Sequence, residues 1–228
     1  PLPTELSSPD IPVSTKLFDR NGKLLYEIYA GTRRSPVKID ELPDHIKNAT
    51  IAIEDKDFYK HSGFSFTGIA RSVWKIITRG KIEGGSTLTQ QLVKNALLSP
   101  ERTIRRKARE FFLTIIVEGI YSKDKILSMY LNQIPYGSTA YGIESASELY
   151  FGKPAKDLNL AEASLIAGLP QSPTRYSPFG AHPELAKERQ KEVLTQMVKN
   201  GYINQEEADR TFEIELKYVE IKAPVAPH

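Results

Sequence analysis

The chain has 228 residues, of which 40% are hydrophobic and 26% charged, a composition typical of a globular domain with a substantial core. The absence of cysteine excludes disulfide scaffolds, thiolate zinc sites and cysteine nucleophiles, and the four scattered histidines lack the spacing of a histidine zinc site. The net charge of +3 is too small to indicate a partner by itself.

The predicted elements begin with a β-hairpin over residues 15–28, where Asn21 and Gly22 form a turn signal between two runs of strand formers. Apolar residues then recur at three- and four-residue spacings, which predicts helices after Pro43 and over 113–120, 125–133, 143–150, 161–169 and 184–198. Prolines mark a loop at 170–178, and alternation from Phe212 to Tyr218 predicts a closing strand.

The positive charge is concentrated in one part of the chain. Residues 71–109 contain ten basic and two acidic residues, so this stretch carries +8 while the remainder carries −5. Such polarity indicates an anionic ligand, for which nucleic acid, phospholipid headgroups and a phosphorylated substrate all qualify. A solvated basic face without a ligand is the alternative.

Three segments could carry chemistry. In the first, Glu54 and Asp55 end an apolar helical run, and a carboxylate against apolar walls gains the raised pKa that a general acid or base needs. The alternative is an acidic pair that simply ends a helix in solvent, with His61 as a packing residue.

The second segment runs from Glu83 to Asn95. Its glycines provide a flexible loop, Ser86 or Thr87 can cap the following helix, and Thr87, Gln91 and Lys94 would share one helical face. A helix that opens from such a loop suits a phosphate, although the lysine spacing is not that of a nucleotide P-loop. A capped surface helix explains the pattern equally well.

The third segment places Arg106 and Lys107 on one helical face with Glu110. This pattern is either a surface salt-bridge cluster or a set of cations for a diphosphate, with Glu110 orienting one cation or helping to bind a divalent ion.

Together these segments resemble the ordered signatures of the peptidoglycan glycosyltransferases, glycosyltransferase family 51. The motifs are E-D-x-x-F-x-x-H-x-G at 54–63, G-x-S-T-x-T-Q-Q at 84–91 and R-K-x-x-E at 106–110, followed by similar fourth and fifth motifs at 125–144 and 163–173. The hairpin at 15–28 resembles the start of the class A penicillin-binding proteins, of the 1A type.

The resemblance implies a mainly α, lysozyme-like, two-lobed helical domain with a small N-terminal β-hairpin and a membrane-proximal jaw lobe. The expected organisation is a hairpin and linker at 1–37, a catalytic domain at 38–200 with the jaw at roughly 62–100, and a closing strand and linker at 201–228. The linker would lead to a transpeptidase domain, whose combination of S-x-x-K with S-x-N and K-T-G does not occur in these residues.

The implied activity is polymerisation of lipid II into β-1,4-linked glycan strands, with inversion and release of undecaprenyl diphosphate, in bacterial cell wall synthesis. The catalytic residues would be Glu54 as base and Glu110. The substrate-binding residues would be Asp55, Ser86, Thr87, Gln90, Gln91, Lys94, Asn95, Arg106 and Lys107. No cofactor is required, although Glu110 could bind a divalent cation such as Mg²⁺.

The implied partners are lipid II, the lipid-linked glycan strand, the membrane surface and other cell wall synthesis proteins, and not nucleic acid. The implied location is the extracytoplasmic, periplasmic side of the bacterial cytoplasmic membrane. No run of about 18 apolar residues occurs in the sequence. Residues 64–79, however, interleave Trp74 and Phe66 with cations such as Arg71, which predicts a segment at a bilayer interface.

Two other functions compete with this one. A lysozyme-like hydrolase or lytic transglycosylase shares the glutamate chemistry, but it needs an acid for a sugar leaving group and has no use for clustered cations. A non-catalytic module for anionic surfaces or nucleic acid explains the basic stretch but not the setting of Glu54, and no nucleic-acid signature is present.

Overall fold

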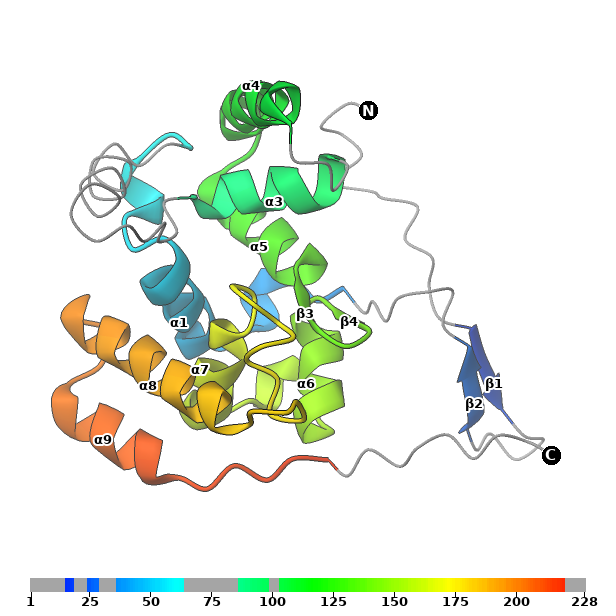
Figure 1. The fold of residues 1–228 in the computed structure, drawn as a ribbon, viewed down its shortest axis with the longest axis vertical. Helices are drawn as coiled ribbons and strands as arrows, with labels where there is room; N and C mark the ends of the chain where they lie inside the picture. Colours follow the sequence, from blue (N-terminus) through cyan, green and yellow to red (C-terminus); the bar gives the residue numbers. More distant parts are fainter. Residues whose placement is uncertain (1–14, 19–23, 29–35, 64–85, 99–102, 220–228) are drawn as a thin grey trace.

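The computed structural model describes residues 15–18, 24–28, 36–63, 86–98 and 103–219. This part is mainly helical, as the sequence predicts (Figure 1). Its helices are α1 (Asp44–Glu54), α3 (Leu88–Leu97), α4 (Ile104–Ile120), α5 (Lys123–Gln133), α6 (Ile143–Phe151), α7 (Leu160–Gly168), α8 (Glu184–Lys199) and α9 (Gln205–Glu213). Short 3-10 turns lie at η2 (Ile39–Glu41), η3 (Phe58–Lys60) and η4 (Ala155–Asp157).

The predicted N-terminal hairpin is confirmed. Strands β1 (Thr15–Phe18) and β2 (Leu24–Ile28) pair antiparallel, with Thr15 opposite Ile28. A second small pair that the sequence analysis did not predict, β3 (Pro135–Gly137) and β4 (Ala140–Tyr141), lies between α5 and α6. It leads into Gly142, which has a φ of 84°, and a Cβ there would lie 2.6 Å from the Asn132 carbonyl oxygen, so the turn requires glycine.

Helix α1 contributes to both hydrophobic clusters of the described part. Ile46 and Ile51 pack in the larger cluster, together with residues of α3, α4, α5 and α6. Ala49 and Ala52 pack in the smaller cluster with residues of α7, α8 and α9. The C-terminal end of α1, where Glu54 lies, is therefore fixed at the junction of the two clusters.

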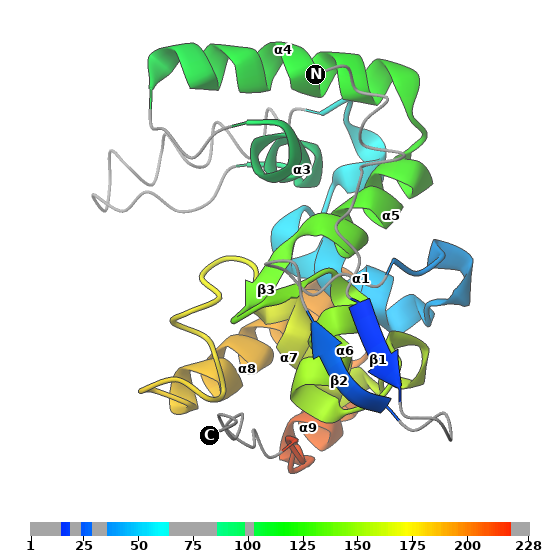
Figure 2. The ribbon, with the colours of Figure 1, turned by 90° about the vertical axis from the view of Figure 1, so that its right-hand side faces the viewer.

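Helix α4 is an outer layer of the molecule and covers α3 (Figure 2). The apolar run predicted at 113–120 is the second half of this longer helix, which begins after Thr103. The Thr103 hydroxyl accepts a hydrogen bond from the backbone N–H of Arg106 at 3.1 Å, an N-cap that starts the helix ahead of the basic residues.

The closing strand predicted from Phe212 to Tyr218 is wrong for the described residues. Phe212 belongs to α9, whose N-cap Asn204 accepts a hydrogen bond from the Glu207 N–H at 2.8 Å. Residues 214–219 follow without a strand partner, and the Val219 N–H donates to the Tyr150 carbonyl at 3.0 Å. Tyr218 stacks on the Phe151 ring, but Ile214 is 46% exposed, so the alternating residues form no continuous buried face.

Several predictions concern residues outside the described part. The interfacial segment at 64–79 and most of the jaw at 62–100 are among them, and the domain boundaries at 37 and 200 stay predictions. None of the helices described is long and apolar enough to cross a bilayer.

Candidate active site

Glu54 occupies the last position of α1, with one carboxylate oxygen engaged and the other free. Its Oε2 accepts a hydrogen bond from Gln91 Nε2 at 2.6 Å, whereas Oε1 is buried with no partner among the described residues. Burial raises the pKa of Glu54, and this effect outweighs the lowering by the Gln91 bond and by the positive charge of Arg189. A carboxylate with a raised pKa and a free oxygen can accept a proton from a bound hydroxyl group.

Asp55 differs from Glu54 because both of its carboxylate oxygens have hydrogen-bond partners within the protein. The residue is 7% exposed. His61 Nε2 lies 2.9 and 3.0 Å from its two oxygens, and the Leu88 N–H donates to Oδ2 at 3.1 Å. These bonds tie the end of α1 to the start of α3. The placement favours the positioning role expected for Asp55, while contact with substrate stays a prediction.

Thr87 is the N-cap of α3, so of the two capping residues that the sequence left open, Ser86 and Thr87, the structure uses Thr87. Its hydroxyl accepts from the Gln90 N–H at 3.3 Å and donates to the Gly63 carbonyl at 2.8 Å, while Gln90 Oε1 accepts from the Thr87 N–H at 3.0 Å. Both side chains are buried within this capping box. Ser86, by contrast, lies exposed just before the helix.

Gln91 connects Glu54 to the core. Its Nε2 donates to Glu54, and its Oε1 accepts from the Tyr130 hydroxyl at 3.3 Å. Lys94 and Asn95 follow one turn later on α3, both exposed. The same helix therefore carries a donor to the carboxylate and, one turn further along, an exposed cation and an exposed amide whose nitrogen donates to the Gln91 carbonyl at 2.9 Å.

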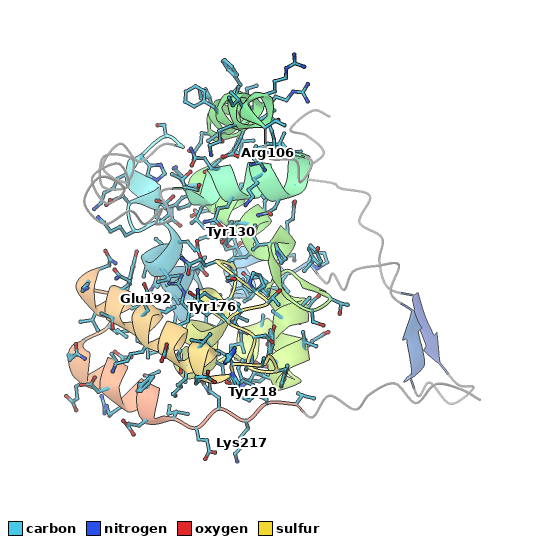
Figure 3. The ribbon with its side chains drawn as sticks, in the orientation of Figure 1. Arg106, Tyr130, Tyr176, Glu192, Lys217 and Tyr218 are labelled. Carbon is cyan, nitrogen blue, oxygen red and sulfur yellow. The ribbon has the colours of Figure 1, made fainter. Side chains whose placement is uncertain are left out.

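Arg106 and Lys107 lie in the first turn of α4, the helix that packs on α3. Figure 3 places Arg106 between α4 and α3, and its buried Nε has no partner among the described residues. Lys107 Nζ donates to Glu110, whose side chain is 3% exposed while that of Lys107 is 61% exposed. Glu110 thus orients an exposed ammonium group, as expected for a residue that orders a cation site.

The divalent cation expected at Glu110 stays a prediction. In the described ranges, no group of three or more His, Asp or Glu side chains is placed to hold a metal ion. The Glu110 carboxylate is instead engaged by Lys107.

Three residues around Glu54 are not among the predicted site residues, although Tyr130 and Tyr136 lie within the fourth motif. Tyr130 and Tyr136 are fully buried, and burial together with the charge of Glu54 raises the pKa of both phenols, so both stay neutral. The Tyr130 hydroxyl donates to Gln91, whereas the Tyr136 hydroxyl has no partner among the described residues. Arg189 is 6% exposed and donates to Glu192 at 2.6 Å and to the Gly168 carbonyl at 3.3 Å. All three sit at core positions of amphipathic helices or strands, where spacing predicts packing only.

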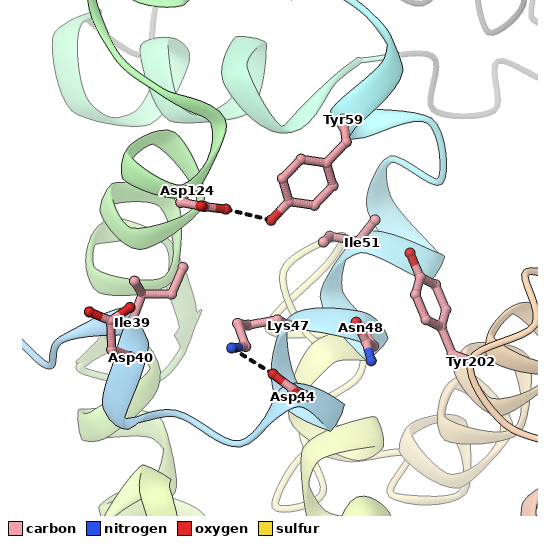
Figure 4. Close-up of a pocket in the computed structure, with 9 residues that line it drawn as sticks. All are labelled: Ile39, Asp40, Asp44, Lys47, Asn48, Ile51, Tyr59, Asp124 and Tyr202. Carbon is pink, nitrogen blue, oxygen red and sulfur yellow. Dashed lines mark hydrogen bonds and ion pairs between the residues drawn. The ribbon is translucent and has the colours of Figure 1, made fainter.

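A hollow of about 360 Å³ lies on the side of α1 that faces η2 and η3 (Figure 4). Three aspartates line it, of which Asp44 pairs with Lys47 at 2.7 Å and Asp124 accepts from the Tyr59 hydroxyl at 2.8 Å. None of the predicted site residues lines this hollow. The negative charge of its carboxylates would repel a diphosphate, so the hollow differs in the ligand it can bind from the cation-bearing site.

Residues 21–198 match the sequence profile of the Transglycosylase family. The match covers most of the chain, which therefore belongs to the transglycosylase family and confirms the resemblance seen in its motifs.

Among its relatives, penicillin-binding protein 1F of Bacillus subtilis (strain 168) is 44% identical over 196 residues, or 86% of this chain and 27% of that protein. Penicillin-binding protein 1A of Aquifex aeolicus (strain VF5) is 43% identical over 208 residues, or 91% of this chain and 28% of that protein. The chain thus spans little more than a quarter of the length of either relative.

The crystal structure of penicillin-binding protein 1A from Haemophilus influenzae has a similar fold. The TM-score is 0.56 at 24% sequence identity, and the match covers 92% of this chain and 22% of that one. At this identity the likeness concerns the fold alone. It confirms the mainly helical, lysozyme-like domain that the motifs imply.

Proposed function

We propose that this chain polymerises lipid II as a peptidoglycan glycosyltransferase. The observation that carries the proposal is the arrangement along α3: Gln91 donates to the raised-pKa carboxylate of Glu54, and Lys94 follows one turn later on a helix that packs against the cation-bearing α4. A base and a group of cations on adjacent elements suit the attack of a hydroxyl group on a carbon that bears a diphosphate.

In the proposed reaction, the 4-hydroxyl oxygen of an incoming lipid II sugar forms a bond to the anomeric carbon of the lipid-linked glycan. The proton of that hydroxyl moves to Glu54. The bond from the anomeric carbon to the diphosphate oxygen breaks with inversion, and the leaving diphosphate keeps the electron pair. Lys94, Arg106 and Lys107 stabilise the negative charge that develops on it, and Glu110 holds Lys107 in place.

Incubation of the purified protein with labelled lipid II tests this function. We expect glycan polymer and released undecaprenyl diphosphate. Shortening of preformed glycan without synthesis would identify a hydrolase, and binding without turnover would identify a non-catalytic module; either result would refute the proposal.

A substrate with a polyprenyl tail also requires a position at the membrane. We propose that α4 lies on the extracytoplasmic surface of the bacterial cytoplasmic membrane, because one stripe of this helix exposes large apolar side chains. Phe112 is 64% exposed, Ile115 48%, Ile116 44% and Ile120 57%. Exposed apolar side chains at helical spacing favour insertion at the headgroup boundary. The first turn of the same helix carries the cations proposed for the diphosphate.

Replacing Phe112 and Ile116 together with Ser is expected to weaken binding to anionic phospholipid vesicles about tenfold. The reason is that two partly exposed apolar side chains contribute on the order of 1.4 kcal/mol or more when they leave water. Vesicle co-sedimentation measures the effect. Ile214→Ser, which alters a side chain that is 46% exposed after α9, is the control. Equal binding by a folded double variant would contradict the placement of α4.

A further inference from the structure

Glu118 is a nearly buried carboxylate that the proposed reaction does not use. It lies in α4, and its side chain is 7% exposed. Its Oε1 accepts a hydrogen bond from the Thr89 hydroxyl of α3, and Lys123 Nζ at the start of α5 lies 2.9 Å from Oε1 and 2.8 Å from Oε2. A single carboxylate thus joins three helices, which Figure 2 shows stacked at one end of the molecule.

The partners of Glu118 have further contacts with the segment that follows Glu54. Lys123 Nζ lies 4.5 Å from the centre of the buried Phe58 ring, in cation–π geometry. Gly63 packs directly on Glu118, since a Cβ at that glycine would come within 2.9 Å of Glu118 Cγ. The carboxylate is therefore enclosed by the first-motif segment as well as by the helices.

Thr89 is the partner closest to the site. It is fully buried and lies two residues before Gln91, the residue that donates to Glu54. Because Thr89 and Gln91 belong to the same helix, a bond that fixes Thr89 also fixes the rotation of α3 and the direction of the Gln91 amide. The path from Glu118 to Glu54 runs through the buried Thr89 hydroxyl, about half a turn of α3 and the Gln91 side chain.

We propose that Glu118 is a positioning residue of this active site: through Thr89 it fixes α3 so that Gln91 stays hydrogen-bonded to Glu54. The proposal rests on the role of Glu54 in the proposed function. Glu118 touches neither the substrate nor the reacting atoms, so its loss should lower kcat and leave KM nearly unchanged.

The hydrogen bond from Gln91 provides a readout that general destabilisation would not move. This bond lowers the pKa of Glu54 against the effect of burial, so a displaced Gln91 leaves that pKa higher than in the unaltered protein. The other groups that act on Glu54 are the Asp55 carboxylate, the Arg189 guanidinium and the phenols of Tyr130 and Tyr136. All of them are retained in the variants below.

Thr89→Val tests the proposal, because it removes the hydroxyl and keeps the shape of the side chain. We expect the titration midpoint of Glu54, measured by carboxyl carbon-13 NMR on the whole chain, to shift upward. We also expect the kcat for lipid II polymerisation to be about tenfold lower, with KM within about twofold of the unaltered value. Thr89→Ser, which retains the hydroxyl, should restore both values. The double variant Thr89→Val with Glu118→Gln should lose less kcat than the product of the losses in the two single variants.

The matched control is Thr50→Val. Thr50 is also buried, and it lies in the same helix as Glu54, but its hydroxyl donates only to the Ile46 carbonyl of that helix at 2.9 Å. An unmoved Glu54 titration in Thr89→Val, or an equal shift in Thr50→Val, would overturn the positioning role. The titration needs no lipid II, so it decides this role even if the unaltered protein fails to polymerise lipid II, which would refute the proposed function instead.

Discussion

Glu54→Gln is expected to lower lipid II polymerisation at least about 1,000-fold while the protein stays folded. The amide keeps the size of the side chain and can still accept a hydrogen bond from Gln91, but it cannot take the proton of the attacking hydroxyl, and a positioned general base contributes roughly 10²- to 10⁴-fold. Radiolabelled glycan separated by gel electrophoresis measures the loss, and circular dichroism checks the fold.

The control for this variant is Asp44→Asn, which removes a carboxylate from the first turn of the same helix. Asp44 is exposed and pairs with Lys47, so its loss should change the rate by no more than about twofold. Near-normal polymerisation by folded Glu54→Gln would show that another group is the base.

The raised pKa of Glu54 also sets the expected response to pH. Activity should fall as the pH drops through this pKa, because the protonated carboxyl cannot act as a base, and the midpoint should lie above the ordinary glutamate value of about 4.3. The effect of pH on stability has the opposite sign to its effect on activity. The folded state holds the proton more tightly, so the contribution of Glu54 to the free energy of unfolding is fully present below the ordinary value and is lost as the pH rises through the raised one. Glu54→Gln should remove both dependences.

Arg106→Ala is expected to reduce kcat/KM about 100- to 1,000-fold, the cost of removing one preorganised donor to a developing negative charge. The buried Nε of Arg106 has no protein partner in the described part of the chain, so at least this donor is available to a diphosphate. Arg106→Lys should recover part of the loss, since it keeps the charge but not the planar two-pronged geometry. Steady-state kinetics on lipid II measure each variant.

Arg210→Ala is the matching control for this second change. Arg210 is 71% exposed on α9, and its contact with Glu206 spans 3.9 Å, so its removal should leave kcat/KM within about twofold. If Arg106→Ala stayed within threefold of the unaltered protein while remaining folded, the leaving group would have to be stabilised elsewhere.

Local pattern predicted most of the helices and the cap at Thr87, because helical spacing and cap chemistry are properties of neighbouring residues. The links that make the site are different. Gln91 and Glu54 are 37 positions apart, as the hydrogen bond between them records, and Thr89 and Glu118 are 29 apart. The spacing of apolar residues along the chain does not predict contacts between residues so far apart in sequence. Tyr130 illustrates the limit, since it occupies a core position in α5 and also donates to Gln91.

The strand wrongly predicted at 212–218 has the same origin. Alternating apolar residues predict a strand when alternate side chains face one surface. Here Phe212 lies in α9, Ile214 is exposed, and Tyr218 contacts the rings of Phe151 and Phe179. The sequence carries the alternation but not the identity of the element that receives it.

The anchoring of α1 in both hydrophobic clusters has a consequence for turnover. A carboxylate at the end of a helix that is packed on two sides cannot swing freely. The next residue, Asp55, also holds this end of α1 against the start of α3. The orientation of the proposed proton acceptor is therefore established once, when the chain folds, and in the proposed reaction it need not be rebuilt for each sugar added. A polymerase that repeats one bond-forming step many times gains from such a fixed reference point, because the parts that move between additions can then be the glycan and the lipid.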